Sequence, residues 1–493
     1  MSAHGERQQQ AAALYERLRA LCPQAAHLSA DSRRISPGDV FLAFPGRAHD
    51  ARAFIAQAAA AGAAAVVWEA QGFAWPEHVH LPNLPVHGLR ALAPLLAARW
   101  YGEPSQALWM SGVTGTNGKT SIAHWLGQSL DACGRRAAIL GTLGNGLIGA
   151  LAPASHTTPD CVTLQRLLAE YRAAGAQAVA MEVSSHALDQ GRVEGVHFDV
   201  AILSNLSRDH LDYHGDMATY AAAKAKLFGW PDLKWAVLNL DDEFGLSLYE
   251  RLQGSRVERL GYGFAAGELR AAQLRVSATG LAFRVHTPWG SGEVASPVLG
   301  AFNAYNLLAV LGGLLAAGVD LDTALARLAE VRPVTGRMQT LRADSGPTVV
   351  VDYAHTPDAL EQTLKALRGL TRGRLICVFG AGGGRDRGKR PLMGAVAAQL
   401  ADRVIVTADN PRNEDPAHIA ADILAGMPPG QDVILDRASA IRTAVLEAGA
   451  EDVVLIAGKG HETYQEVHGA RLPFSDLEVA RAALTQRSSH AAA

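Results

Sequence analysis

Cysteine is scarce in this sequence of 493 residues, and long apolar stretches are missing. The four cysteines lie far apart without a Cys-x-x-Cys pair, which argues against a disulfide framework and a zinc site. The longest apolar run, 307–319, is too short to cross a membrane, and residues 1–10 are polar without the apolar core of a signal peptide. These absences predict a cytoplasmic protein without membrane insertion.

An excess of charge of one sign is also lacking. The 45 Lys and Arg residues nearly balance 48 Asp and Glu residues, for a net charge of −3. This balance gives no electrostatic reason to expect a nucleic-acid or membrane-surface partner. We find no internal repeat and no low-complexity linker. The composition is that of a globular protein, and the length predicts about three domains.

Short apolar runs alternate with helical patterns along the chain, which predicts an α/β fold with parallel sheets. Clusters of helix- and strand-breaking residues at 101–105 and 332–336 indicate two boundaries. We therefore predict an N-terminal domain of residues 1–103, a central domain of residues 104–331 and a C-terminal domain of residues 332–493.

The stretch Ser111–Thr120 reads Ser-Gly-Val-Thr-Gly-Thr-Asn-Gly-Lys-Thr, after a short apolar run and before an amphipathic pattern. Strand, glycine loop and helix in this order are typical of a phosphate-binding loop. Backbone N–H groups converge on phosphate there, Lys119 adds a cation, and Thr120 offers a hydroxyl to Mg²⁺. Val113 departs from the strict spacing, which has glycine at that position. A chance Gly-Lys-Thr turn is the alternative.

Candidate Mg²⁺ ligands follow two strands of the central domain. Glu182 ends one apolar run, and Asp209-His210 come after the next. Because the carboxyl ends of parallel strands meet at one edge of a sheet, we expect these residues near each other. As alternatives, such a glutamate can cap a helix, and a lone histidine is commonly structural. Lys224, taken alone, reads as a solvated helix cation.

Four apolar strands of the C-terminal domain each end in a polar or glycine-rich loop, and such loops converge at one edge of a doubly wound sheet. The loop 380–391 carries three arginines, Arg385 among them, and a later loop ends in Arg412. Guanidinium groups pair with planar anions, whereas Glu462 in the last loop suits an ammonium. The set predicts a site for a small amino acid, with surface salt bridges as the alternative.

Four stretches of the chain together resemble the Mur ligase family. The stretch Thr114–Thr120 has the family's form of phosphate loop, which also lacks a glycine at the position of Val113. The resemblance continues through 181–188 and 204–215. Asp409-Asn410-Pro411-Arg412 is similar to the motif of the members that add meso-diaminopimelate. The resemblance implies a small N-terminal α/β domain that binds a uridine nucleotide, a central P-loop-type ATPase domain with a parallel sheet, and a C-terminal Rossmann-like domain, in a monomer.

The resemblance also implies that ATP and Mg²⁺ are bound. The ATP-binding residues would be Gly112, Thr114, Gly115, Thr116, Asn117, Gly118, Lys119, Thr120, Asn303, Arg337 and Asp352. The metal ligands would be Thr120, Glu182, His210 and Lys224, and the catalytic residues Lys119, Glu182, His210 and Lys224. In the family the lysine matching Lys224 is a carbamate, which turns a cation into an anionic ligand.

Substrate contacts follow from the same resemblance. Ser32 would hold the uridine nucleotide. The muramoyl dipeptide would contact Thr157, Thr158, Ser184, Gln190 and Arg192, and diaminopimelate would contact Arg385, Asp409, Asn410, Arg412, Gly458 and Glu462. The family's usual Asn before Thr-Thr-Pro is His156 here, and we assign that position no role.

The implied reaction activates a carboxylate before an amide forms. ATP would phosphorylate the D-glutamyl γ-carboxylate of UDP-MurNAc-L-Ala-D-Glu, and the amine of meso-diaminopimelate would then displace phosphate. Rival interpretations are a lysine-adding sister ligase and a folylpolyglutamate synthetase-like ligase, against which the motif at 409–412 argues. From other classes, a P-loop ATPase or kinase and a non-catalytic nucleotide-binding scaffold remain.

Overall fold

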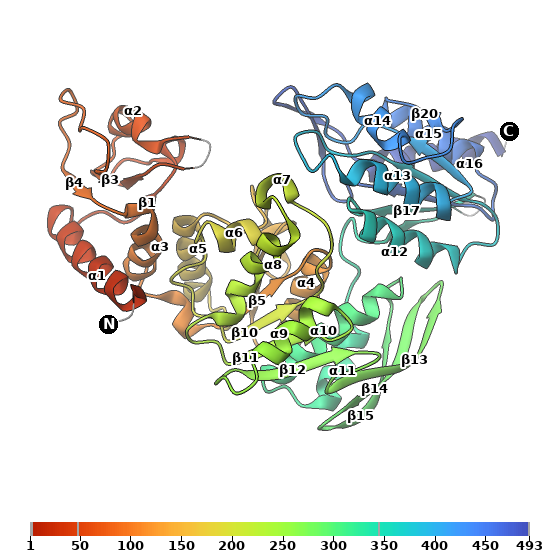
Figure 1. Ribbon diagram of the computed structural model, residues 1–493, viewed down its shortest axis with the longest axis horizontal. Helices are drawn as coiled ribbons and strands as arrows, with labels where there is room; N and C mark the ends of the chain where they lie inside the picture. Colours follow the sequence, from red (N-terminus) through yellow and green to blue (C-terminus); the bar gives the residue numbers. More distant parts are fainter. Residues whose placement is uncertain (1–2, 47–48, 344–345, 492–493) are drawn as a thin grey trace. The chain divides into compact units, whose positions relative to one another are not determined.

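The computed structural model describes residues 3–46, 49–343 and 346–491 (Figure 1). The chain packs as two compact units, and each is described by itself. The first unit comprises Met1–Gly112, Gly134–Ala201 and Lys226–Lys234, and the second comprises Val113–Cys133, Ile202–Ala225 and Trp235–Ala493. Within the described ranges, no helix is both long and apolar enough to span a membrane.

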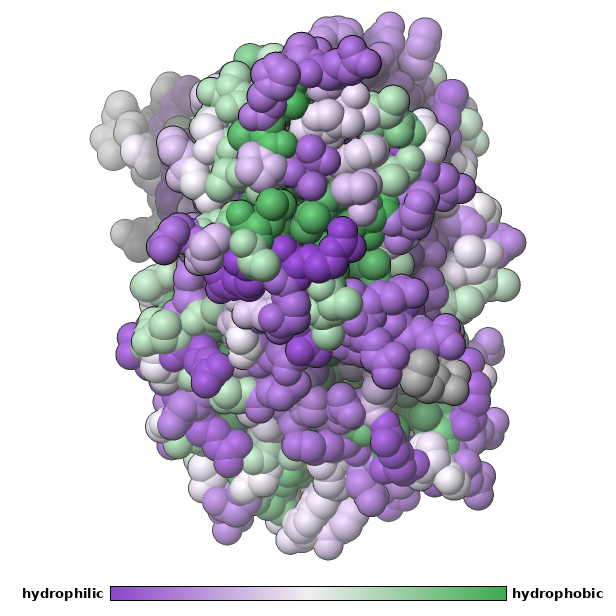
Figure 2. Space-filling view, turned by 90° about the vertical axis from the view of Figure 1, so that its left-hand side faces the viewer, coloured by the Kyte–Doolittle hydropathy of each residue, from purple (hydrophilic) through white to green (hydrophobic). Residues whose placement is uncertain are grey.

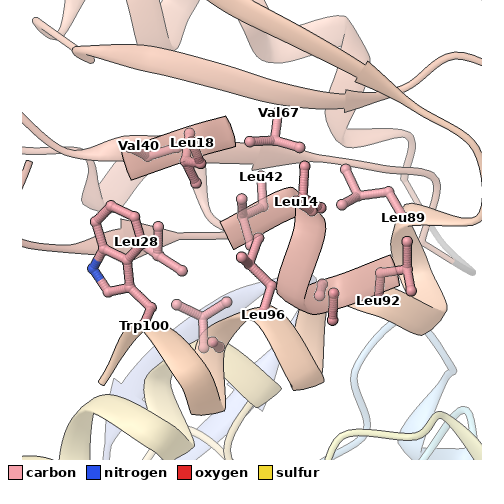
Figure 3. Close-up of a cluster of buried hydrophobic side chains, with 14 of the residues drawn as sticks. Leu14, Leu18, Leu28, Val40, Leu42, Val67, Leu89, Leu92, Leu96 and Trp100 are labelled. Carbon is pink, nitrogen blue, oxygen red and sulfur yellow. The ribbon is translucent and has the colours of Figure 1, made fainter. Parts of the chain in front are cut away.

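The first unit begins with a four-stranded parallel sheet. Its strands, in spatial order, are β1 (Leu28–Ser29), β2 (Val40–Ala43), β3 (Ala65–Glu69) and β4 (Asn83–Val86). Helices α1 (Ala3–Leu21) and α3 (Leu89–Trp100) cover one face, where Leu18, Leu42 and Leu96 belong to one core (Figure 3). Helix α2 (Ile55–Ala60) covers the other face, with Ile55 against Phe41 and Val66 in a second core. Both faces are therefore buried, as the apolar runs predict.

The largest sheet has eleven strands in the order β15-β14-β13-β12-β11-β10-β5-β9-β6-β7-β8. Its central strands are β5 (Trp109–Thr114), β6 (Ala137–Gly141), β9 (Ala178–Glu182), β10 (Val200–Leu203), β11 (Trp235–Asn239) and β12 (Glu258–Gly263). Strand β6 is parallel to β9, and β11 is parallel to β12. Loops that follow parallel strands share one edge of a sheet, which is where ligands bind in such folds.

Further strands extend this sheet at both ends, with antiparallel pairing except between β12 and the strand that follows it, which are parallel. At one end are β7 (Gly144–Leu147) and β8 (Ala150–Ala152), and at the other are β13 (Leu269–Ser277), β14 (Gly280–Thr287) and β15 (Gly290–Ser296). The associated helices are α4 (Lys119–Ala132), α5 (Cys161–Ala173), α6 (Ser185–Asp189), α7 (Leu211–His214), α8 (Met217–Ala225), α9 (Glu243–Arg251), α10 (Phe302–Ala316) and α11 (Leu321–Ala329). Helices α4 and α10 pack together at Gly313, where an added Cβ would lie 3.1 Å from the side chain of Leu126.

The C-terminal sheet has six strands in the order β16-β17-β21-β18-β19-β20. They are β16 (Gln339–Leu341), β17 (Thr348–Asp352), β18 (Leu375–Phe379), β19 (Arg403–Val406), β20 (Asp432–Val433) and β21 (Val453–Ala457), all parallel except β16. Helices α12 (Pro357–Arg368), α13 (Lys389–Leu400) and α14 (Pro416–Leu424) share one core with the sheet, and α15 (Arg437–Glu447) and α16 (Asp476–Ala491) share another. The hairpin β22 (Tyr464–Val467) and β23 (Ala470–Pro473) stands apart from the sheet. The predicted doubly wound, Rossmann-like architecture is confirmed.

Three details of the sequence interpretation are wrong. The stretch 141–149 is rich in glycine and reads as a loop in the sequence, but it contains β7, because antiparallel pairing with β6 satisfies its backbone groups. Strand β5 continues through Thr114, so the phosphate loop is shorter than predicted. The extension β13–β15 was not predicted, although buried Leu281, Phe283 and Val285 alternate with more exposed residues in β14.

Hydrophilic residues prevail on the face shown in Figure 2, and apolar residues gather in a band across its upper middle. Large exposed apolar side chains such as Phe54, Trp289 and Leu472 come from separate elements of the chain. Scattered exposure of this kind is usual for folded proteins.

Candidate active site

Two glycines shape the loop between β5 and α4. Gly115 and Gly118 have φ angles of 140° and 88°, a conformation that favours glycine. An added Cβ on Gly115 would lie 1.9 Å from Oγ of Ser204, and one on Gly118 would lie 2.4 Å from Oδ1 of Asn306. Helix α4 begins at Lys119 without a side-chain cap, so its first N–H groups are suited to an anion.

Neighbouring segments hold this loop through hydrogen bonds to Asn117. Its backbone N–H donates to Oδ1 of Asn205 at 2.9 Å, and its carbonyl accepts from Nδ2 of Asn205 at 3.2 Å. Its own Nδ2 donates to Oδ2 of Asp358 at 2.8 Å. The loop is thus preorganised, since its backbone is fixed by protein contacts alone.

Lys119 lies over the loop and donates to the carbonyl oxygens of Gly115 and Thr116 at 3.0 and 2.9 Å. The hydroxyl of Thr120 is buried and accepts from Nη2 of Arg337 at 3.0 Å. Arg337 was predicted beside the base and ribose of ATP. Here its guanidinium contacts the hydroxyl predicted to meet Mg²⁺.

Lys224, on α8, is 1% exposed, which excludes its interpretation as a solvated cation. Its Nζ donates to the carbonyl of Gly115 at 2.6 Å and lies over the ring of Tyr220. Burial and the charge of Lys119 hold the pKa of Lys224 well below its usual value, although Asp209 acts in the opposite direction. A buried amine that stays neutral can act as a nucleophile.

Asp209 is the centre of a buried charge cluster. Its carboxylate lies 3.2 Å from Nζ of Lys389, 3.4 Å from Nε2 of His210 and 3.6 Å from Nε2 of His355. Burial raises the pKa of Asp209, but the hydrogen bond with His355 and the charges of Lys389 and His210 outweigh it and bring the pKa well below its usual range. Lys389, a further cation of the loop 380–391, therefore meets a protein carboxylate.

Glu182, in the first unit, ends β9 and is 1% exposed. Its Oε1 accepts from the N–H of Thr142 at 2.8 Å and its Oε2 from the hydroxyl of Thr142 at 3.2 Å. Sequence reasoning missed Thr142. Thr142 lies there because β6 pairs in parallel with β9, which brings the residue after β6 beside the end of β9. Neutral donors hold Glu182 as an oxygen acceptor suited to a hard cation.

The five residues predicted to hold the muramoyl dipeptide gather beside Glu182. The hydroxyl of Thr157 lies 3.0 Å from that of Thr142, and the hydroxyl of Thr158 donates to the carbonyl of Glu182 at 2.8 Å and accepts from the N–H of Ser184 at 3.0 Å. Arg192 donates to the carbonyl of Thr158 at 3.1 Å and to Oε1 of Gln190 at 2.8 Å. One hydrogen-bonded network thus contains all five.

The loops that follow β18, β19 and β21 meet around Asn410 in the second unit. Its Nδ2 donates to Oε2 of Glu462 at 2.8 Å. An added Cβ on Gly458 would lie 2.5 Å from Oδ2 of Asp409, whose own Oδ1 accepts from the N–H of Asn410 at 2.6 Å. Arg412 has its Nε 3.3 Å from Oε2 of Glu466. The residues predicted to bind the amino acid, apart from Arg385, therefore lie in one cluster.

The three arginines of the loop 380–391 have different partners. Arg390 is fully buried against Glu414 and Asp422, at 2.9 and 2.8 Å, and Arg387 also pairs with Asp422 at 3.0 Å. These two therefore form salt bridges, as the alternative predicted, although Arg390 is buried and not at the surface. Arg385 is exposed, and an added Cβ on Gly382 would lie 3.7 Å from it and 2.9 Å from Arg412.

The remaining predicted residues form local contacts. In the first unit the hydroxyl of Ser32 lies 3.3 Å from Oε1 of Gln57. In the second, Asn303 donates to the carbonyl of Leu299 at 2.7 Å. Asp352 accepts from the N–H groups of Met338 and Ala354 at 2.7 and 2.9 Å, and burial raises its pKa while Arg337 opposes the change.

The donor set offers few protein ligands for a cation. Across the residues that the structure describes, no three His, Cys, Asp or Glu side chains form a group that could hold a metal ion. Mg²⁺ in sites that bind nucleotides takes many of its ligands from phosphate and water, so a small protein contribution is compatible with it. The buried acceptor oxygens of Glu182 and Thr120 are of the right chemical type.

The α/β fold and the glycine loop between β5 and α4 are typical of proteins that bind phosphate groups. Comparisons with known proteins are consistent with this class. Residues 24–101 match the Mur ligase family catalytic domain, residues 113–314 the Mur ligase middle domain, and residues 336–460 the Mur ligase glutamate ligase domain. The chain belongs to the Mur ligase family. The three-domain α/β fold predicted from the sequence is thereby confirmed.

Three individual proteins that carry the same name are similar to this chain over most of its length. The UDP-N-acetylmuramoyl-L-alanyl-D-glutamate--2,6-diaminopimelate ligase of Chromobacterium violaceum is 52% identical over 462 residues, which cover 93% of this chain and 94% of that protein. The ligase of the same name from Pseudomonas aeruginosa is 51% identical over 475 residues, 95% and 98% of the two chains. A solved structure of a ligase of this name superposes with a TM-score of 0.66 at 39% identity, covering 94% of this chain and 95% of that one.

Proposed function

We propose that this protein catalyses the ATP-dependent addition of meso-diaminopimelate to UDP-MurNAc-L-Ala-D-Glu, with release of ADP and phosphate, in the synthesis of peptidoglycan precursors. The observation that carries the proposal is the identity of 52% and 51% to ligases of this name over more than nine tenths of both chains. The clusters around Lys119, Glu182 and Asn410 support the proposal, because each offers groups of a chemical type that such a reaction uses.

ATP binds at the loop between β5 and α4 in this proposal. The N–H groups at the start of α4 and the ammonium of Lys119 bind the outer phosphates, because both present positive charge to an anion. The γ-phosphoryl group is transferred to the D-glutamyl γ-carboxylate, and the resulting acyl phosphate is attacked by the amine. The amine loses a proton and phosphate leaves as the amide bond forms.

As protein ligands of Mg²⁺ we propose Thr120, Glu182, His210 and a carbamate on Lys224, since hydroxyl and carboxylate oxygens are the donors that this ion prefers. When bound, the ion reduces the repulsion between the phosphates and the substrate carboxylate. Glu182 is kept as an acceptor by the two bonds from Thr142. The neighbouring network of Thr157, Thr158, Ser184, Gln190 and Arg192 orients the dipeptide so that its γ-carboxylate is held for phosphoryl transfer.

The proposed carbamate forms on Lys224 by the ordinary reaction of an amine with carbon dioxide. The neutral amine donates its lone pair to carbon dioxide, a C–N bond forms, and one proton leaves to solvent. Its burial and its lowered pKa support this step, because only an unprotonated amine can react. Isotopically labelled bicarbonate gives the test: an NMR signal of a labelled carbamate in the native protein, absent from Lys224→Ala, is the expected result.

Diaminopimelate binds at the cluster around Asn410, with Glu462 on its distal ammonium and Arg412 and Arg385 on its distal carboxylate. L-Lysine has no such carboxylate, so Arg412 would lose a partner on binding it. That loss costs roughly 1–3 kcal/mol.

We further propose that the protein is a monomer with three domains, at residues 1–103, 104–331 and 332–493. In the first of these, Ser32 contacts the uridine nucleotide.

The test is phosphate release from ATP in the presence of UDP-MurNAc-L-Ala-D-Glu, with meso-diaminopimelate, L-lysine or no amine. The proposal predicts release that depends on diaminopimelate. Release with lysine alone would favour the sister ligase, and release that needs no amine would favour an ATPase.

A further inference from the structure

Lys459 is a buried lysine that the proposed mechanism does not use. It lies between Gly458 and Gly460, whose φ angles are 119° and 54°. An added Cβ on Gly460 would lie 2.7 Å from the carbonyl oxygen of Gly336 and 2.8 Å from Cβ of Tyr353. The loop is pressed against its neighbours, and the side chain of Lys459 is 0% exposed.

The ammonium of Lys459 closes a ring of hydrogen bonds. Its Nζ donates to Oε2 of Glu462 at 2.7 Å and to Oδ1 of Asn410 at 3.0 Å, and Nδ2 of Asn410 donates to the same Oε2 at 2.8 Å. The N–H of Glu466 also donates to Oδ1 of Asn410 at 2.9 Å, which fixes the orientation of the amide. A buried ammonium is costly unless it is paired, and Glu462 supplies the pairing charge.

Glu462 is held through one oxygen only. Both side-chain donors use Oε2, and in the described part of the chain no protein hydrogen bond reaches Oε1. The side chain is 16% exposed, whereas that of Lys459 is not exposed at all. One carboxylate oxygen is thus bound to the protein, and the other is left to accept a bond from a ligand.

We infer that Lys459 is a positioning residue: by binding Oε2 it orients the Glu462 carboxylate so that Oε1 receives the distal ammonium of the amino-acid substrate. This inference rests on the proposed function. It assigns Lys459 no contact with the substrate, and it makes the preference for an amino acid that carries a distal ammonium depend on a cation inside the protein.

The test compares two amino acids. One is meso-diaminopimelate, and the other is L-2-aminopimelate, which keeps the attacking amine and the distal carboxylate but lacks the distal amine. The native protein should prefer diaminopimelate in kcat/KM by about 10- to 100-fold, the range of one hydrogen bond to a charged group. In Lys459→Met the preference should fall to about threefold or less, with KM for ATP changed less than about twofold.

Further variants separate positioning from simple stabilisation. Lys459→Gln keeps N–H donors without the charge and gives the same comparison if Lys459→Met does not fold. In Lys459→Met combined with Glu462→Gln, the melting temperature should recover relative to the single variants, because no unpaired charge remains, while the preference stays lost. Lys365→Met removes an exposed pair with Glu361 on α12 and should leave both properties unchanged.

The outcomes are distinguishable. Folded Lys459→Met or Lys459→Gln that keeps the native preference overturns the inference and leaves the proposed function standing. If the native protein shows no phosphate release that depends on diaminopimelate, the proposed function fails, and this inference fails with it.

Discussion

Two clusters of the second unit differ in the partners of their cationic side chains, which are backbone carbonyl oxygens in one cluster and carboxylates in the other. Beside the phosphate loop, Lys119 donates to two backbone carbonyl oxygens. Around Asn410, Lys459 and Arg412 lie against the carboxylates of Glu462 and Glu466. Carbonyl dipoles hold a lysine without cancelling its charge, whereas a carboxylate does cancel it. The first arrangement suits a phosphate anion, and the second suits an amino acid that carries both charges.

The largest expected effect is that of Lys119→Ala, which removes the cation from the phosphate loop. We expect phosphate release to fall about a thousandfold or more under all conditions, because charge that develops on the phosphates is no longer stabilised. A steady-state phosphate assay checks this. Retained turnover would show that the carbonyl-held lysine is not needed for an anion and would remove the basis of the comparison.

Lys224→Ala sharpens the comparison by testing whether this lysine serves as a cation or as a carbamate. We expect activity to fall about a hundredfold and to recover in part with added short-chain carboxylic acids, which replace the anionic group. Lys226→Ala, two residues along and paired with Asp189 at the surface, is the control. Without recovery by any such acid, the carbamate proposal loses its support.

Arg412→Ala addresses the second cluster. We expect KM for diaminopimelate to rise about 10- to 100-fold while KM for ATP changes less than about twofold, because a single charge-assisted hydrogen bond to the amino acid is lost. Initial rates at varied concentrations of each substrate give both constants. Equal increases in KM for diaminopimelate and KM for ATP would contradict a role for Arg412 in recognising the amino-acid side chain.

The smallest effect concerns stability and pH. The pKa of Lys224 in the folded chain lies well below its value of about 10.4 in the unfolded chain, so between the two values the unfolded chain binds the extra proton. The contribution of Lys224 to the free energy of unfolding therefore rises with pH in this window, by at most about 1.4 kcal/mol per unit, and is least favourable at low pH.

Lys224→Met lacks this titrating group and should show a smaller slope of stability against pH. Urea unfolding of both proteins between about pH 7 and pH 9, in buffer free of carbon dioxide, measures the difference. Parallel slopes would mean that Lys224 keeps its proton on folding.

The sequence predicted those features that local signals determine. The glycine loop between β5 and α4 was recognisable because Gly115 and Gly118 have a conformation that other residues adopt poorly, and this leaves a pattern within ten residues. The strands of the C-terminal sheet were recognisable because burial on both faces gives continuous apolar runs.

Features that depend on distant partners could not be predicted. Lys224 is buried because it meets Gly115, which lies 109 positions away in the sequence. Thr142 becomes a partner of Glu182 only through the register of β6 with β9. Arg390 and Lys459 have the same residue types as ligand-binding cations, and only the fold reveals that each is already paired with a carboxylate.

The most direct test of the account is formation of the product. The native protein, ATP, UDP-MurNAc-L-Ala-D-Glu and isotopically labelled meso-diaminopimelate are incubated together, and mass spectrometry follows the uridine-linked peptide. The account predicts a labelled tripeptide joined by an amide to the γ-carboxylate, formed in an amount equal to the ADP released. ADP release without labelled peptide would contradict it.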